Sequence, residues 1–306
     1  MKRLIIRTLL FLLPVLAVVM LWEILMYNFP HAFKYKRDVI MTECRKNSEI
    51  VFLGSSHAFY GVNTDILPRA SNLAYVSQEL NQDRFILEQL LSQPNRIKYA
   101  VIPISIFSLF ESRNNLEAWR NRDYVRYWGY PAAKFTDHFF ILDNVAHQLK
   151  YVRKTKKRIK RKGQPGAFSF TASGWGTDYR EAGNIAHFAQ MGKSAAERHG
   201  NVDLENIRHF HDLQAMIKLA AQQQIKVILY TPPGHQSYCR NINSKQEKQM
   251  RELIARAAAE PNVFFIDLLR SREFTDEDFF DPDHMNHRGA EKLARILYTF
   301  CQESSR

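Results

Sequence analysis

A serine after a short apolar run, and an Asp-x-x-His pair near the other end of the chain, are the residues whose types and spacing could do chemistry. The stretch VFLGSSHAFYG ends its apolar run in Gly54, Ser55 and Ser56. Ligands of open α/β sheets bind at the carboxyl ends of the strands, so a hydroxyl at that point is a candidate nucleophile, and Gly54 would allow a tight turn. Glycine and serine are also ordinary turn residues, so an uninvolved turn is the alternative.

The second stretch is FFDPDHMNHRGAEKLA, in which Asp281 and His284 stand three residues apart. A carboxylate so placed can orient an imidazole, which then acts as the general base for a serine. We therefore predict Ser56, Asp281 and His284 as catalytic residues. Two alternatives stay open, because Asp281 or Asn286 could only cap the last helix, and Asp283 could replace Asp281 as the orienting acid.

Apolar runs and helical patterns alternate along the chain. The predicted strands are Ile50–Leu53, Tyr99–Ile106, Ile225–Tyr230 and Val263–Leu268, and the predicted helices are Ser77–Leu91, Asp203–Gln223, a helix from a capping box at Ser244 to about Ala259, and Asn286–Cys301. This alternation predicts an α/β fold with a mostly parallel sheet flanked by helices on both sides.

A serine after the first strand and an Asp-x-x-His before the last helix resemble the chain order of SGNH-type (GDSL-like) hydrolases over most of residues 48–301. Their first block, Gly-Asp-Ser, corresponds to the Gly-Ser-Ser that ends at Ser56, and their last block matches Asp281-Pro-Asp-His284. The resemblance implies the three-layer sandwich of these hydrolases, Ser56 as nucleophile, and neither a metal nor a cofactor.

The blocks of this family that supply the oxyanion hole are altered. The second block, Asn-x-Gly-x-x-Gly, resembles the stretch from Asn72 to Ser77, so the resemblance implies that the backbone N–H groups of Ser56 and Ser77 receive the oxyanion. The third block, Gly-x-Asn-Asp, is not present, and Ser105 or Ser108 is the nearby polar candidate, with Ser105 the predicted side-chain donor. Loss of one oxyanion donor costs about 100- to 1000-fold in rate.

The first 27 residues predict a membrane anchor. Three basic residues precede the uncharged run Thr8–Trp22, and Ile24–Tyr27 extend it beyond Glu23 to the length of a membrane span. A cleaved signal peptide is the alternative, but Ala17 is the only small residue available to a cleavage site. We expect a single-pass cell-membrane protein whose main part lies outside the cytoplasm, although basic residues after the span weaken this orientation.

The GSSH and DHMN stretches and the single span look most like membrane-anchored members of the family, such as the proteins of D-alanyl-lipoteichoic acid transfer and of polysaccharide O-acetylation. The first hypothesis is therefore an extracytoplasmic serine acyl esterase or acyltransferase that acts on a cell-envelope glycan or polymer. The alternative is a catalytically weak accessory protein that binds the acyl carrier or polymer beside an integral membrane acyltransferase. Nucleic acid is not an expected partner.

The predicted segments are an anchor (1–27), a linker (28–47) and a domain (48–306) with a long insertion at 111–202. The insertion contains KYVRKTKKRIKRK, which holds nine Lys and Arg residues and no acid and contributes much of the net charge of +12. This run is either a solvated basic segment or a surface for the phosphates of lipid or polymer.

Two further patterns leave alternatives open. His209 and His211 lie two apart in a predicted helix, where they do not share a face, so a structural role is favoured over a metal pair. Aromatic residues of the insertion form either a sugar-stacking wall or a cover of the sheet: Trp119, Tyr124, Tyr127, Trp128, Tyr130 and Trp175. The three cysteines have neither disulfide-framework nor metal-site spacing.

Overall fold

The computed structural model describes residues 1–112 and 120–304, so Trp119 lies outside the described residues. These residues form two compact units. The first unit joins Met1–Arg37 to Glu117–Phe168, and the second joins Asp38–Leu116 to Ser169–Arg306. The residues predicted as one insertion therefore divide between the two units. The anchor, linker and domain boundaries of the sequence analysis stay predictions.

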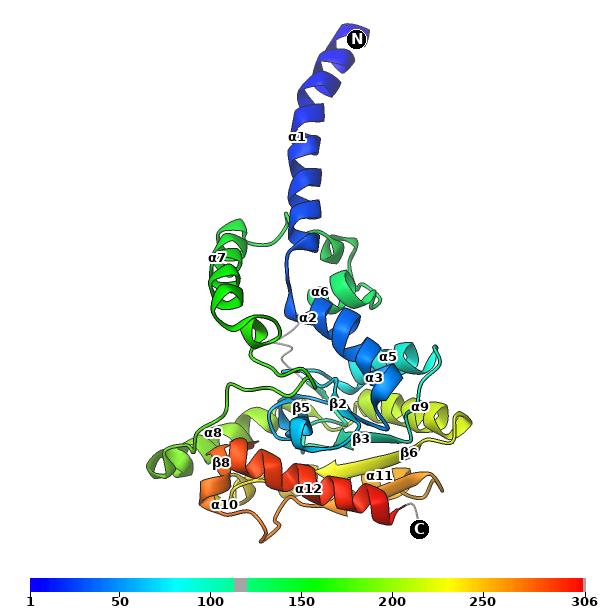
Figure 1. Ribbon diagram of the computed structural model, residues 1–306, viewed down its shortest axis with the longest axis vertical. Helices are drawn as coiled ribbons and strands as arrows, with labels where there is room; N and C mark the ends of the chain where they lie inside the picture. The colour runs from blue at the N-terminus through cyan, green and yellow to red at the C-terminus, as the bar shows by residue number, and fades with distance from the viewer. Residues whose placement is uncertain (113–119, 305–306) are drawn as a thin grey trace. The chain divides into compact units, whose positions relative to one another are not determined.

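The second unit is built on a five-stranded parallel sheet of order β2-β1-β3-β6-β7 (Figure 1). The strands are β1 (Ile50–Phe52), β2 (Ala70–Asn72), β3 (Tyr99–Pro103), β6 (Lys226–Thr231) and β7 (Val263–Asp267). All four predicted strands are present, and the α/β class with a parallel sheet is confirmed. Strand β2 was not predicted, because its three residues, Ala-Ser-Asn, lack the apolar pattern of a buried strand.

Both faces of the sheet are buried. Helix α12 (His287–Glu303), which crosses in front of the strands in Figure 1, buries Leu293, Ala294 and Leu297 in one cluster with Phe52 and Val101. The alternating strand residues that point the other way are also buried, including Val51, Ala100, Ile102, Val227 and Leu229. Because α5 (Leu80–Leu91), α9 (Arg208–Gln222) and α11 (Ser244–Ala257) supply nothing to the α12 cluster, we infer that they cover this second face.

Helix starts differ from the predicted ones. Helix α11 is capped by Asn243, whose side chain accepts hydrogen bonds from the N–H groups of Lys245 and Gln246, so the predicted cap at Ser244 was wrong by one residue. Within α9, His209 is buried and His211 is exposed, as their two-residue spacing predicts.

The remaining elements of this unit are α3 (Met41–Asn47), α4 (Ser56–Phe59), η2 (Thr64–Ile66), β4 (Glu111–Ser112), η7 (Ile185–His187), α8 (Phe188–His199), β5 (Val202–Asp203), α10 (Gln236–Cys239), η8 (Asp276–Asp278), β8 (Phe279–Asp281) and β9 (His284–Met285).

The first unit is organised around the C-terminal end of α1 (Lys2–Asn28). Its segment Ile6–Asn28 is long and apolar enough to cross a membrane and is the one such helix among the described residues. Both oxygens of the Glu23 carboxylate accept backbone hydrogen bonds, from the N–H groups of Phe140 and Ile141, at 2.9 and 2.7 Å. The other elements are α2 (Ala32–Tyr35), α6 (Asn121–Asp123), η4 (Tyr124–Trp128), η5 (Phe135–His138), α7 (Val145–Lys162) and η6 (Gly166–Phe168), and η1 (Lys36–Ile40) joins the units in sequence.

Most of the described aromatic residues of the insertion are core residues. Tyr124, Tyr127 and Trp128 are buried in the first unit. Trp175 is buried in the second unit, where its indole N–H donates to the carbonyl of Tyr60 at 2.8 Å. These four side chains do not form an open wall, so the sugar-stacking interpretation is wrong for them.

Candidate active site

Ser56 stands where β1 leaves the sheet. Gly54 has φ +109°, and a Cβ atom at this position would lie 2.4 Å from Cγ of Pro103, so both its backbone conformation and its surroundings require glycine. The Gly54 N–H donates to the Asp83 carboxylate at 2.7 Å. Helix α4 then begins at Ser56 itself. The turn therefore presents the Ser56 hydroxyl at the carboxyl edge of the sheet, as the sequence predicted.

His284 and Asp281 face each other across the short antiparallel pair of β8 and β9. Nδ1 of His284 lies 3.0 Å from both carboxylate oxygens of Asp281. The Asp281 carboxylate is itself held by the N–H of Asp283, at 3.0 Å. Asn286, not Asp281, caps α12, because its side chain accepts from the N–H of Gly289. The cap interpretation of Asp281 was therefore wrong, and its carboxylate instead fixes the imidazole.

The fold joins these two parts of the chain. Ser56 Oγ and His284 Nε2 are 2.8 Å apart although the residues are separated by 228 positions. All three predicted catalytic side chains thus form one hydrogen-bonded chain: hydroxyl, imidazole and carboxylate. This is the order that an activated serine requires. Their catalytic role stays a prediction until it is tested.

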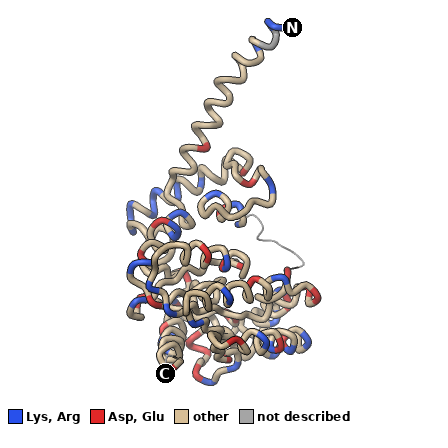
Figure 2. Tube along the Cα trace, turned by 90° about the vertical axis from the view of Figure 1, so that its right-hand side faces the viewer, with Lys and Arg blue, Asp and Glu red and all other residues tan. Residues whose placement is uncertain are grey.

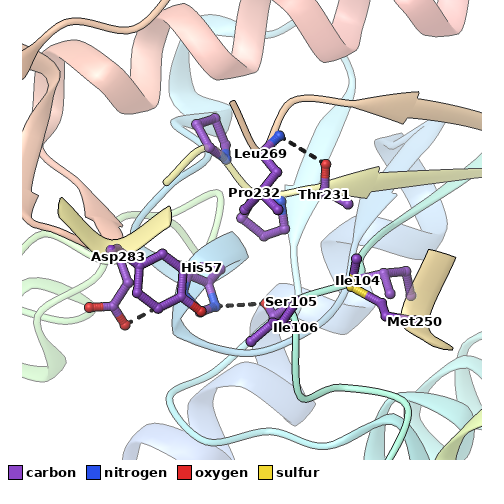
Figure 3. A pocket seen from close by; sticks show the side chains of 11 residues that line it. His57, Ile104, Ser105, Ile106, Thr231, Pro232, Met250, Leu269 and Asp283 are labelled. Carbon is purple, nitrogen blue, oxygen red and sulfur yellow. Dashed lines mark hydrogen bonds and ion pairs between the residues drawn. The ribbon is translucent and has the colours of Figure 1, made fainter. Parts of the chain in front are cut away.

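Behind His284 lies a buried group from which the sequence analysis named Asp283 and Ser105 but missed His57 and His199. The His57 ring stacks on the His284 ring, with centroids 4.9 Å apart and planes 11° from parallel. Nδ1 of His57 lies 2.9 Å from Oγ of Ser105, and its Nε2 lies 3.8 Å from the Asp283 carboxylate, as Figure 3 shows. His199 approaches the same carboxylate oxygen at 3.5 Å. Asp283 is only 4% exposed, so it is a buried charge set among three imidazoles.

The two carboxylates act differently on His284. Oδ2 of Asp283 lies 3.7 Å from Nδ1 of His284 and makes no hydrogen bond with the described residues, so Asp281 is the hydrogen-bond partner. Burial alone would lower the pKa of His284, but the charge of Asp283 and the hydrogen bond that His284 donates to Asp281 outweigh it and raise the pKa. Burial lowers the pKa of His57, and lowers that of His199 to about 3, so these rings stay neutral.

The pKa of Asp283 is held down by its neighbours. Burial alone would raise it, but the charge of His284 and the contact with His57 outweigh burial and hold the pKa well below its usual value. Asp283 therefore keeps its negative charge beside the imidazole that must accept a proton. We infer that it helps to stabilise the imidazolium form of His284.

The negative charge of Asp283 affects the expected pH dependence of activity. A general base must be neutral, so kcat/KM should rise with pH and reach half its plateau above pH ~6.5, the usual pKa of histidine. Replacing Asp283 by asparagine removes the charge that raises the His284 pKa most, and should move this midpoint to lower pH. A matched control is Asp276→Asn, which removes a carboxylate beside His235, outside this group. An Asp283→Asn profile that overlays the wild-type one would contradict the assigned charge effect.

One histidine-carboxylate group could in principle hold a metal ion. Among the described residues, ligand atoms of His57, Asp283 and His284 lie within 4.8 Å of one another. Both ring nitrogens of His284 already have partners, Ser56 on one side and Asp281 on the other. A metal ion would have to break the Asp281 hydrogen bond, so these residues fit an activated serine better than a metal site.

The predicted oxyanion groups are only partly in place. The Ser56 N–H stands at the first position of α4 and donates to no described residue. Ser77 follows β2 in a turn that is closed by a hydrogen bond from the Gln78 N–H to the carbonyl of Tyr75. That turn is tied to the nucleophile loop, because Asp83 accepts from both Gly54 N–H and the Gln78 side chain. The Ser105 hydroxyl lies 2.9 Å from Nδ1 of His57, and its contribution to the oxyanion hole stays a prediction.

Ser77 occupies a backbone conformation that favours glycine, with φ +56°. A left-handed backbone conformation costs a residue with a Cβ atom about 1–2 kcal/mol. Glycine avoids this cost but loses more conformational entropy on folding, which offsets part of the gain. We expect Ser77→Gly to raise the free energy of unfolding by about 0.5–1 kcal/mol, seen as a higher Tm, while the backbone N–H and the activity are kept. Ser77→Ala, which keeps the strain, is the matched control. A stabilisation of equal size in both variants would show that the conformation is not the cause.

Asp83 was also missed by the sequence analysis. Its carboxylate is buried, and burial raises its pKa to about 7, against opposing hydrogen bonds from Gln78 and Gly54. The available signal was its place on the apolar side of a helix, three residues after Leu80 and four before Leu87. Asp83 is a positioning residue, because it holds the backbone that presents Ser56.

Comparison with known proteins assigns no family: no family model and no curated protein matches the sequence. Three solved structures align with the chain at 13% identity. A GDSL-like lipase of Bacteroides thetaiotaomicron covers 89% of this chain and 98% of its own, with a TM-score of 0.42. A proposed acylhydrolase of Bacteroides fragilis covers 90% and 100%, with a TM-score of 0.44. A proposed lipolytic protein of the G-D-S-L family from Desulfitobacterium hafniense covers 83% and 99%, with a TM-score of 0.40. At TM-scores this low, these similarities carry no conclusion about activity.

Proposed function

We propose that the chain is a membrane-anchored, extracytoplasmic serine esterase or acyltransferase of the SGNH type that acts on a cell-envelope glycan or polymer. The observation that carries this proposal is the hydrogen-bonded chain from Ser56 through His284 to Asp281, with distances of 2.8 and 3.0 Å. An imidazole held by a carboxylate on one nitrogen and facing a serine hydroxyl with the other is arranged for nucleophilic catalysis.

The mechanism follows from these contacts. His284 Nε2 takes the proton of the Ser56 hydroxyl as Oγ attacks the carbonyl carbon of an ester, and Asp281 and Asp283 stabilise the imidazolium. The carbonyl oxygen becomes an oxyanion that accepts a hydrogen bond from the Ser56 N–H. The tetrahedral intermediate then releases the alcohol, which takes the proton from His284, and leaves an acyl-serine. Water or a sugar hydroxyl attacks this ester with His284 again as base, and Ser56 is restored.

Aromatic rings beside His284 support a glycan substrate. Tyr179 stacks on Tyr60 and on Phe280, both with ring centroids 4.0 Å apart, and its edge faces His284 at 5.3 Å. The two neighbours cover both faces of the Tyr179 ring, so a ligand can meet only its edge and hydroxyl and the exposed part of the half-buried Phe280 ring. Apolar faces of sugar rings pack on such surfaces, and the tyrosine hydroxyl adds a polar contact.

Membrane anchoring is supported by the way α1 ends. The Trp22 indole N–H donates to Oε1 of Gln148 at 2.9 Å, and Glu23 holds the backbone of Phe140 and Ile141. A signal peptide is removed from the mature protein, and removal here would leave these partners without their hydrogen bonds. We therefore favour a retained anchor over a cleaved signal.

The alternative is an accessory protein with weak or no catalysis beside a membrane acyltransferase. One observation favours it: the Ser105 hydroxyl, the predicted side-chain donor to the oxyanion, is bonded to His57. With one donor fewer, the rate would fall by about 100- to 1000-fold, as expected for a protein that binds acyl groups more than it transfers them.

The deciding experiment treats the full chain in detergent with an activated serine-directed phosphonate and measures intact mass. We expect one phosphonyl adduct on the wild type and none on Ser56→Ala or His284→Ala. Circular dichroism of each variant controls for folding. A folded wild type that gains no adduct would favour the accessory function over the enzyme, and an adduct that persists in Ser56→Ala would refute the nucleophile.

A further inference from the structure

We propose that the basic face of α7 binds the phosphate headgroups of anionic phospholipids in the membrane that α1 enters. The basic face is defined here as Lys150, Arg153, Lys154, Lys157 and Arg161. This inference rests on the membrane anchoring in the proposed function but not on its esterase chemistry.

The cations of α7 lie on one side of the helix. Each member of the basic face lies three or four residues from another member, so together they share a face, while Gln148 and Thr155 on the opposite side are buried. Eight of the nine Lys and Arg side chains of α7 are exposed, Arg158 being the exception. None of the eight forms an ion pair with any residue that the structure describes. The helix therefore presents an uncompensated positive surface.

Contacts within the first unit set the level of α7 relative to α1. Gln148 bonds to Trp22, in the last turns of the apolar segment, and the Tyr151 hydroxyl donates to the carbonyl of Pro30, beyond its end, at 3.3 Å. Gln148 therefore contacts a residue inside the span, and Tyr151, one turn further along α7, contacts a residue beyond the end of the span. Tryptophan and tyrosine favour the level of the headgroups at the ends of a membrane span. The basic face begins at this level.

Exposed apolar side chains lie on α7 and on the segment that precedes it in the chain. Phe135, Leu142 and Leu149 are 78%, 58% and 45% exposed. Leu142 directly follows Ile141, whose N–H is bonded to Glu23 of the span. Figure 2 shows α1 almost free of charged residues above this point. Exposed apolar residues next to a basic helix are the pattern of a surface that lies in a membrane interface.

Like charges within the basic face argue that it has an anionic partner. Lys150 and Lys154, Arg153 and Lys157, and Lys157 and Arg161 stand four residues apart, a spacing at which equal charges destabilise a helix. No acidic residue lies within α7 to relieve this repulsion. Phosphate headgroups at the end of the span would neutralise it. A membrane surface fits better than a free polymer, because the same segment also exposes apolar side chains.

The test is lysine footprinting of the full chain in nanodiscs. The chain is reconstituted in phosphatidylcholine alone or with phosphatidylglycerol added, treated with N-hydroxysuccinimidyl acetate, and analysed by peptide mass spectrometry. We expect the acetylation rates of Lys150, Lys154 and Lys157 to fall about fivefold with phosphatidylglycerol, from the usual strength of one cation at an anionic surface. High salt should restore the rates. Lys245 and Lys248 on α11, in the other unit, serve as internal references.

A charge-removal variant isolates the role of the basic face. Replacing Arg153, Lys154, Lys157 and Arg161 by glutamine should remove the protection of Lys150 by phosphatidylglycerol. The matched control replaces Lys193, Lys218, Lys245 and Lys248 of the second unit and should keep that protection. Circular dichroism of both variants controls for folding.

Three outcomes would overturn the inference. Equal acetylation rates in both nanodiscs would show that the basic face does not bind the headgroups. Equal protection by inorganic polyphosphate in phosphatidylcholine nanodiscs would show that it binds phosphate polymers instead of lipid. A chain that does not co-purify with nanodiscs would refute the anchoring as well. Phosphonate labelling of Ser56 is read separately, so failure of the esterase proposal would not be confused with any of these results.

Discussion

Ser56→Ala should reduce kcat for hydrolysis of p-nitrophenyl acetate by about 10⁴-fold or more, because it removes the atom that attacks the ester. His284→Ala should reduce kcat by a similar factor, since the hydroxyl is weakly nucleophilic without a base 2.8 Å away. The two groups act as a unit, so the double variant should be no slower than either single variant. Initial rates over a range of substrate concentrations, with the full chain in detergent, measure these effects.

Two serines serve as comparisons for this result. Ser92, which is exposed at the end of α5 and whose hydroxyl donates to the carbonyl of Gln89, is a neutral control for serine-to-alanine exchange. Ser55→Ala tests the neighbouring hydroxyl, whose partner is Nδ1 of His57, 3.3 Å away, and not His284. If Ser55→Ala abolished hydrolysis while Ser56→Ala retained it, the assigned nucleophile would be wrong.

Asp281→Asn should lower kcat by about 10²- to 10⁴-fold with little change in KM. The carboxylate lies 3.0 Å from Nδ1 of His284 and keeps the proton on that nitrogen, so that Nε2 can accept from Ser56. An asparagine amide can hold the opposite tautomer and supplies no charge to stabilise the imidazolium. Steady-state kinetics and the rate of phosphonate labelling would both report the loss.

Asp283→Asn is the matched comparison, because it removes the other carboxylate near His284. Its nearest oxygen lies 3.7 Å from Nδ1 and forms no hydrogen bond there, so we expect a smaller loss of kcat together with the shifted pH profile described above. A greater loss of kcat for Asp283→Asn than for Asp281→Asn would reverse the assignment and make Asp283 the orienting acid, the alternative that the sequence left open.

The long elements of the fold were predictable because each carries its signal within a few neighbouring residues. The strands at Ile50, Tyr99, Lys226 and Val263 each contain a continuous apolar run, the pattern of buried strands in a parallel sheet, although β7 at the edge of the sheet is mostly half-buried. Strand β2 was missed because its polar sequence has no such run, and it pairs with β1 only because the neighbouring strand offers free backbone groups. Local patterns cannot reveal a strand that tertiary pairing alone creates.

By itself, the sequence determined which residues could do the chemistry and roughly where they would lie: a serine after the first strand, and a histidine three residues after an aspartate in a turn. Residues three apart in a turn lie close together, so the contact between Asp281 and His284 could be predicted from the sequence. Only the tertiary structure decided that Ser56 reaches His284 across 228 residues, and that His57 and Asp283 lie behind them. It also decided that α7 is held to the end of α1. These contacts join segments far apart in the chain, and their partners are chosen by packing of the whole unit, which no local pattern encodes.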